Sequence, residues 1–302
     1  LYDCALVVGF EKLYHADKRR SFEALSAAMD VESGLAFLTE FSNSRGDEPM
    51  LWPGAGESRS IFMDMYSYYA RQYMRKLGLT QEHFAKISVK SHRIAAMNPR
   101  SQYQREVTVQ EVLESGDVVF PLTRMMCAPL GDGAAAAVIC SRELAAQLTT
   151  EPVWVTASVM GSGTLQSEGD YVAETLAPRV YEAAGLGPED IDVVEVHDTT
   201  SPAEIIFLVQ LGLCPPDQAA RWIDEEMTGL DGVMPTNPSG GLQSKGHPVG
   251  ATGAAQIFEI VNQLRGRSGP RQVKDVQVGM THNGGGVLGP GAAAMALHIF
   301  TR

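Results

Sequence analysis

The chain has 302 residues, of which 44% are hydrophobic and 20% are charged, as in an ordinary globular protein with room for two packed domains. Its formal net charge of −12 argues against bulk binding to nucleic-acid phosphates, so an anionic ligand needs a local basic patch. No apolar run is long enough for a membrane helix, and four cysteines without paired spacing are typical of a reduced, cytoplasmic protein.

The first half of the chain predicts a strand, a long irregular stretch and then helices. Residues 2–9 are apolar and predict a buried strand, whereas the mixed composition of 13–57 predicts mainly loops. The sequence begins inside that apolar run without an initiator Met, so we expect an N-terminal piece before it. Helices are predicted over 59–77, 80–91 and 108–114, the last with Thr108 and Glu111 as a capping box, and a small-residue strand over 134–140.

The second half alternates between strands and helices. Its apolar runs predict strands over 153–160, 192–196, 275–281 and 291–299, and its helical periodicity predicts helices over 171–184, 201–212 and 252–265. This alternation is typical of a layered α/β sheet with mostly parallel strands. We place a single domain boundary near residue 150, which divides the chain into 1–150 and 151–302.

The stretch V-V-E-V-H-D-T-T-S-P-A-E, residues 193–204, carries the first candidate site. His197 follows a predicted strand, at the end of the strand where ligands collect in open α/β sheets. A histidine there can orient water, donate to an oxyanion or act as a base, although hydrogen bonding to nearby backbone explains a lone His197 slightly better. Ser201 and Glu204 have the spacing of a capping box and predict the start of the next helix.

Two glycine-rich segments carry further histidines. In N-P-S-G-G-L-Q-S-K-G-H-P-V-G-A-T-G, residues 237–253, His247 is held in a rigid turn between glycine and proline. In T-H-N-G-G-G-V-L-G-P-G, residues 281–291, His282 precedes three glycines whose N–H groups are natural oxyanion donors, although a hairpin also uses glycines. Because all three histidines lie at strand ends or glycine loops, we expect them to share one pocket.

These three motifs, in this order and spacing, resemble the thiolase superfamily, in particular the sterol-carrier-protein-type thiolases and the related lipid-transfer-type aldolases. The segments H-F-A-K-I-S-V-K-S-H (83–92), N-P-R-S-Q-Y-Q (98–104) and C-A-P-L-G-D-G-A-A-A-A-V (127–138) resemble the same branch, so the likeness covers nearly the whole chain. It implies a layered, thiolase-like α/β fold of two βαβαβ-type halves, with a loop domain inserted in the first at about 13–125. Part of that first half is expected to precede residue 1.

The resemblance also implies roles for the histidines. His247 would activate a nucleophilic cysteine and help to bind the thioester oxygen, while His197 would help to form the other oxyanion site. His282 stands where many thiolases carry a second cysteine, the one that moves the α-proton. Backbone groups would complete the oxyanion sites, and those expected to do so are Gly246, Gly284 and Gly285. No metal is expected.

The sequence departs from the family pattern at the two cysteines. Thr199 occupies the position after His-Asp where the sterol-carrier-type enzymes usually carry the acid/base cysteine, and its hydroxyl cannot lose a proton near neutral pH as a thiol can. The nucleophilic cysteine of the family would precede residue 1. All four cysteines present, which are Cys4, Cys127, Cys140 and Cys214, are expected to be buried and inert.

A basic segment between residues 86 and 105 lacks acidic side chains and is our candidate for the phosphates of coenzyme A. The residues expected to bind coenzyme A are Lys86, Lys90, Arg93, Arg100, Ser239 and Gly240. A solvated helix face explains any single basic residue about as well. Tyrosines in the helix at 59–77, Tyr66 among them, could line an acyl pocket or supply a catalytic phenol, but packing explains them better.

Three functions remain open. A thiolase-like acyltransferase would cleave a 3-ketoacyl-coenzyme A in lipid or steroid side-chain degradation. A retro-aldolase would cleave a β-hydroxyacyl-coenzyme A, such as a steroid side-chain thioester, and Thr199 favours it because it needs no cysteine. A non-catalytic subunit would bind acyl-coenzyme A or a partner. The resemblance implies coenzyme A as a substrate with no permanently bound cofactor, a homodimer and a small zinc-ribbon/OB-fold partner protein.

Overall fold

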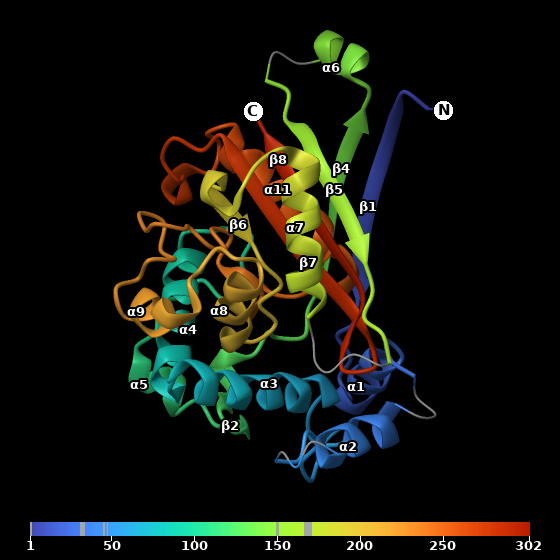
Figure 1. Cartoon of the computed structure of the whole chain (residues 1–302), viewed down its shortest axis with the longest axis vertical. Coiled ribbons are helices and arrows are strands. Elements are labelled where there is room, and N and C mark those ends of the chain that lie inside the picture. The colour runs from blue at the N-terminus through green and yellow to red at the C-terminus, as the bar shows by residue number, and fades with distance from the viewer. Residues whose placement is uncertain (1, 31–33, 45, 47, 149–150, 166–170) are drawn as a thin grey trace.

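The computed structural model describes the whole chain except residues 1, 31–33, 45, 47, 149–150 and 166–170. It confirms a mixed α/β fold built in layers, as Figure 1 shows. Helix α7 (Val172–Ala184) crosses the front of a four-stranded sheet, and α11 (Thr252–Leu264) lies behind it, between the sheet and a second strand pair. The sheet has the order β5-β8-β7-β6, and its strands are β5 (Trp154–Gly161), β8 (Gly291–Thr301), β7 (Val278–Leu288) and β6 (Val193–Glu195).

The prediction of mostly parallel strands is wrong for this sheet. Only β6 and β7 run parallel, whereas β7 pairs with β8, and β8 with β5, in antiparallel fashion. Strand β7 extends to Leu288 and turns at once into β8, and two strands joined by a tight turn must be antiparallel. The glycines expected in a loop after 281 therefore lie inside a strand.

The second strand pair joins β1 (Cys4–Lys12) to β4 (Asp132–Cys140) in an antiparallel ribbon. The strand predicted over 2–9 is present, but the prediction that it is buried is wrong, because Leu6 is 66% exposed and Val8 55%. Of the described elements, mainly α11 and the turn Val249–Ala251 pack against the ribbon. A Cβ atom on Gly9 would lie 2.4 Å from the carbonyl oxygen of Gly250, so glycine permits this close approach.

The chain between β1 and β4 is richer in helices than expected. It contains α1 (Lys18–Ser26), α2 (Gly34–Ser44), α3 (Ile61–Leu77), α4 (Gln81–Ala96), α5 (Val109–Leu113) and the short hairpin of β2 (Asp117–Val119) and β3 (Leu122–Thr123). Helices α1 and α2 correct the prediction of loops over 13–57. Apolar side chains of that stretch, such as Leu38 and Met50, pack with Ile61 and Met65 of α3 in a small separate core. The capping box of Thr108 and Glu111 is confirmed.

The second half has the βαβαβ order that its sequence predicts. It also contains α8 (Ser201–Gln210), α9 (Ala219–Asp224) and α10 (Gly241–Lys245), while α6 (Arg142–Leu148) precedes it. In the described residues before 150, only β1 and β4 form long strands, so a complete βαβαβ half occurs once. The boundary near 150 falls on residues 149–150, which lie outside the described residues, and it stays a prediction. No helix in the described part of the chain is long and apolar enough to cross a bilayer.

Candidate active site

Parallel pairing of β6 and β7 brings His197 and His282 together. Residue Glu195 of β6 is paired with Thr281 of β7, so the residues that follow Glu195 lie beside those that follow Thr281. The backbone N–H of His197 donates a hydrogen bond of 3.3 Å to Nδ1 of His282. His282 is fully buried, and its ring centroid lies 4.2 Å from that of Phe207 on α8.

The hydrogen bond to His282 determines which of its nitrogens carries a proton. Because Nδ1 accepts from the His197 backbone, the neutral ring carries its proton on Nε2. That Nε2 is buried and has no hydrogen-bond partner among the described residues. A role for His282 in place of the second cysteine stays a prediction, since its ring is fully buried against Phe207 rather than at an open surface.

The glycine-rich loop brings His247 to the same place. The ring centroids of His197 and His247 are 5.0 Å apart, at an interplanar angle of 68°. Nδ1 of His247 lies 2.7 Å from the hydroxyl of Thr252, and that hydroxyl donates to the carbonyl of Pro248. Since the hydroxyl has one proton, Nδ1 must donate to it, which leaves Nε2 of neutral His247 with a free lone pair. This is the arrangement of a general base.

Asp198 anchors the glycine-rich loop to the strand that carries His197. Its carboxyl group accepts hydrogen bonds from the N–H of Leu242, at 2.7 Å, and from the side chain of Gln243, at 3.2 Å. A Cβ atom on Gly241 would lie 2.2 Å from the same carboxyl, so no larger residue fits there. Burial, helped by the charge of Glu204, raises the pKa of Asp198 to about 8. The sequence shows the His-Asp pair but not this anchoring contact.

Thr199 is the fourth predicted site residue, and it lies beside His197. Its hydroxyl oxygen is 3.5 Å from Nε2 of His197 and accepts a hydrogen bond of 3.2 Å from the phenol of Tyr66. Tyr66 comes from α3, more than a hundred residues away along the chain. The four predicted residues His197, Thr199, His247 and His282 are therefore brought together, and Tyr66 joins them.

The glycines expected to bind an oxyanion do not lie in the open loops that the sequence predicted. Gly284 and Gly285 pair with Met295 and Ala294 in the β7–β8 ladder, so they do not form an exposed loop. A Cβ atom on Gly284 would still lie 4.0 Å from Nδ1 of His197, which places this glycine beside the histidines. The N–H of Gly246 donates to the carbonyl of Leu242, so it is not a free oxyanion donor as expected.

All three site histidines are held neutral at physiological pH. Burial, with the charge of Lys245, lowers the pKa of His197 to about 4, and burial next to His197 lowers that of His282 to about 3. Burial, together with the neighbouring His197 and Lys245, lowers the pKa of His247 well below its usual value. A neutral imidazole can accept a proton, so these groups are suited to act as bases or hydrogen-bond donors rather than as cations.

We expect the variant His282→Gln to lose less stability in acid than the unaltered protein. Above about pH 6.5 a histidine is neutral in both the folded and the unfolded state, but below it the unfolded state takes up a proton first. The folded protein therefore loses up to about 1.4 kcal/mol per pH unit through His282, until the pH reaches its folded pKa of about 3.

Denaturant unfolding of the two proteins between about pH 7 and pH 4 measures this difference. Glutamine keeps an acceptor for the N–H of His197 but cannot titrate, so the stabilities of the two proteins should converge as the pH falls. A difference in stability that stays constant with pH would contradict the low pKa of His282.

Most residues expected to bind coenzyme A do not form one patch. Lys86 and Arg93 lie on the part of α4 that faces α9 and the chain after it, where they pair with Asp224 at 2.9 Å and Glu226 at 2.6 Å. Lys90 is 3% exposed and pairs with Glu204, so the prediction that it contacts a phosphate is wrong. Because α4 packs against α8 and α9, Lys90 is buried, whereas Lys86 and Arg93 stay partly exposed and are paired with acidic side chains.

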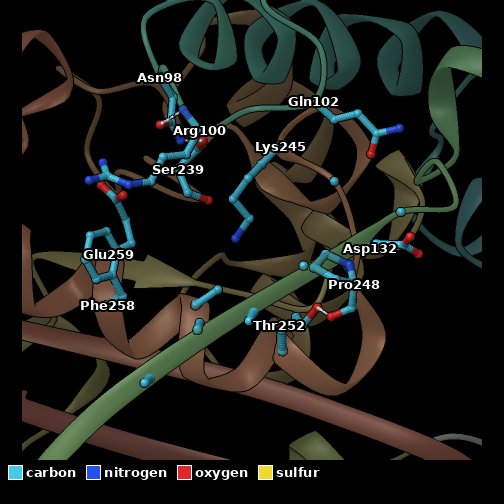
Figure 2. A pocket seen from close by; sticks show the side chains of 18 of the residues that line it. Asn98, Arg100, Gln102, Asp132, Ser239, Lys245, Pro248, Thr252, Phe258 and Glu259 are labelled. Carbon is cyan, nitrogen blue, oxygen red and sulfur yellow. Dashed lines mark hydrogen bonds between the residues drawn. The ribbon is translucent and has the colours of Figure 1, made fainter. Parts of the chain in front are cut away.

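Ser239 and Arg100 instead line a cavity of about 760 Å³ between β4, α11 and the turn at 98–102, shown in Figure 2. Lys245 extends into this cavity, and its Nζ lies 3.7 Å from a carboxyl oxygen of Glu195. Gly246 and Pro248, the neighbours of His247, also line it, but His197, Thr199 and His282 do not. Gly240 is turned away, since a Cβ there would lie 2.7 Å from that of Ala95. The cavity adjoins the histidine cluster without containing it.

Comparison with known proteins finds relatives that match most of this chain. The family model described as thiolase C-terminal domain-like matches residues 164–297. The chain is 42% identical over 247 residues to an acetyl-CoA acetyltransferase of Methanothermobacter thermautotrophicus, which covers 80% of this chain and 63% of the relative. It is 33% identical over 318 residues to the non-specific lipid-transfer protein-like 2 of Caenorhabditis elegans, covering 96% of this chain and 73% of the relative.

Other relatives are longer than this chain. It is 35% identical to the sterol carrier protein 2 of Bos taurus and of Homo sapiens, and it spans about half of their length, 53% and 52%. Among solved structures it resembles the Ltp2-ChsH2(DUF35) aldolase, with a TM-score of 0.71 and 28% identity over 79% of this chain and 63% of that one.

Proposed function

The chain belongs to the thiolase superfamily, in the branch of the sterol-carrier-protein-type thiolases and lipid-transfer-type aldolases, and we propose that it cleaves a carbon–carbon bond beside an acyl-coenzyme A thioester. The observation that supports this most is the meeting of His197, His247 and His282 beside the carboxyl end of β6. Neutral imidazoles in a buried site can move protons and donate to the enolate oxygen that such a cleavage produces.

In the leading form of the proposal, the protein is an acyltransferase that acts on a 3-ketoacyl-coenzyme A, with coenzyme A as the second substrate. The free lone pair on Nε2 of His247 suits a base that activates a thiol. The expectation that all four cysteines are buried is wrong, because Cys4 is exposed on the β1–β4 ribbon and only Cys214 is fully buried. None of these four described cysteines is seen in contact with His247. Cys127 lies next to Thr200, but its thiol donates to the carbonyl of Thr123 and burial raises its pKa to about 12. This form therefore requires a nucleophilic cysteine outside the described residues.

The alternative is a retro-aldolase that acts on a β-hydroxyacyl-coenzyme A, such as a steroid side-chain thioester. It is supported by Thr199, which stands beside His197 where a thiol would serve a thiolase, and by the similarity to the Ltp2-ChsH2(DUF35) aldolase. Since that name joins two components, a small zinc-ribbon/OB-fold partner belongs to the proposal, and so does the homodimer that the family resemblance implies. Catalysis by His197, Thr199 and His247, and oxyanion binding at Gly284 and Gly285, are proposed for both forms.

Turnover of two substrate classes decides between the forms. The full-length protein is given coenzyme A with a 3-ketoacyl-coenzyme A, or a β-hydroxyacyl-coenzyme A alone, and products are identified by mass spectrometry. Consumption of one free coenzyme A per cleavage indicates the acyltransferase, whereas release of an aldehyde or ketone without it indicates the aldolase. Binding of both thioesters without any product would contradict an enzyme and favour a non-catalytic subunit.

A further inference from the structure

Tyr66 connects a distant helix to the histidine cluster. Its half-buried side chain projects from α3, and its phenol donates a hydrogen bond of 3.2 Å to the hydroxyl of Thr199. Thr199 is 8% exposed, and its hydroxyl oxygen lies 3.5 Å from Nε2 of His197. Three proton-carrying groups thus follow one another from α3 to the end of β6, each within reach of the next.

The direction of these hydrogen bonds permits a proton to travel toward His197. Because the hydroxyl of Thr199 accepts from Tyr66, its own proton is available for Nε2 of His197. Neutral His197 then carries its proton on Nδ1, the nitrogen that lies on the side of Gly284. A proton that arrives at Nε2 therefore allows one to leave from Nδ1.

We propose that Tyr66 is the proton source of this site and acts through Thr199 and His197, an inference that rests on the proposed function. When the carbon–carbon bond breaks, its electron pair passes to the enolate of the departing acyl-coenzyme A. The α-carbon of this enolate takes the Nδ1 proton of His197, Thr199 replaces it at Nε2, and the phenol of Tyr66 restores the Thr199 hydroxyl. The tyrosinate left behind takes a proton from solvent, which its half-buried side chain can reach.

The phenol of Tyr66 supplies an ionisable proton, which the hydroxyl of Thr199 alone cannot. An aliphatic hydroxyl does not ionise near neutral pH, whereas a phenol has an ordinary pKa of about 10 and can give up a proton transiently. Both the acyltransferase and the aldolase leave an enolate, so the role of Tyr66 does not depend on which of them operates. A neighbouring tyrosine of α3 makes a different contact, since the phenol of Tyr73 accepts from Gln210.

The test follows exchange of the α-protons of an acyl-coenzyme A in heavy water, by mass spectrometry, in the full-length protein. By microscopic reversibility, the group that protonates the enolate also governs this exchange. We expect Tyr66→Phe and Thr199→Val to slow it by about 100-fold or more with unchanged thioester binding, and the double variant to be no slower than either. Thr199→Ser, which keeps a hydroxyl, should restore most of the rate.

The control is Tyr73→Phe, which removes a phenol from the same helix but not from this chain of groups, and thermal melting confirms that each variant is folded. If Tyr66→Phe exchanges the α-protons as fast as Tyr73→Phe does, the role of Tyr66 is overturned and the proposed function still stands. Additive losses in the double variant would show that Tyr66 and Thr199 act separately, and would also overturn it. If the unaltered protein neither cleaves nor exchanges any acyl-coenzyme A, the proposed function and this inference fall together.

Discussion

Replacement of His247 by alanine lowers kcat for the acyl-coenzyme A substrate by about 10³-fold while KM changes little. A positioned general base contributes between about 10² and 10⁴ to rate, and His247 has the features of one. It is neutral, its Nδ1 is oriented by Thr252, and its Nε2 lone pair is free near His197. Steady-state kinetics with the substrate class that turns over measures the loss.

A histidine outside the site provides the control for His247. His298 on β8 is also partly buried with a lowered pKa, but it contacts Ser158 rather than the histidine cluster. His298→Ala should keep nearly the rate of the unaltered protein, because His298 does not contact the histidine cluster. Equal rates for His247→Ala and His298→Ala would show that the reaction takes place elsewhere.

Replacement of Lys90 by alanine destabilises the protein by about 3–5 kcal/mol, because it leaves a buried carboxylate without its counter-charge. The Lys90 ammonium lies 2.5 Å from Glu204 and also donates to the hydroxyl of Thr228 and the carbonyl of Thr236. Both partners are nearly inaccessible, with 3% and 1% of their side chains exposed. The pair ties α4 to α8, the helix that begins just after Thr199 and Thr200.

Lys86 is a matched control, one helical turn earlier on α4. It pairs with Asp224 at 2.9 Å, but both side chains are about two-fifths exposed, at 36% and 47%. An exposed pair is worth about 1 kcal/mol or less, so Lys86→Ala should have a small effect on the free energy of unfolding. Denaturant unfolding compares the two variants, and equal stabilities would mean that the Lys90–Glu204 pair contributes no more than a surface contact.

The chemistry-bearing motifs were recognisable in the sequence because they are local. A short apolar run predicts the end of β6, although β7 continues past its predicted end at 281 to Leu288. Residues at matching positions of neighbouring parallel strands lie side by side. The meeting of His197 with His282 follows from that rule. The rigid G-H-P turn and the capping box of Thr108 and Glu111 were equally visible, since each depends on neighbours a few residues apart.

Contacts between segments far apart in the chain could not be predicted from the sequence. Ser201 and Glu204 have the spacing of a capping box, yet Thr200 is the N-cap and Glu204 pairs with Lys90, because a buried carboxylate is stabilised more by a counter-charge than by a helix end. The periodicity of α4 likewise does not show whether its basic face is exposed to solvent or packed against α8 and α9.

By itself, the sequence determined which residues carry the candidate chemistry and that His197 follows a strand, because strand starts, turns and caps depend mainly on local sterics and hydrogen bonding. Only the tertiary structure decided that Tyr66 reaches Thr199, that Lys90 is buried and that the glycines after His282 continue a strand. Those outcomes depend on which surfaces pack together, and packing energy is shared among residues far apart in the chain.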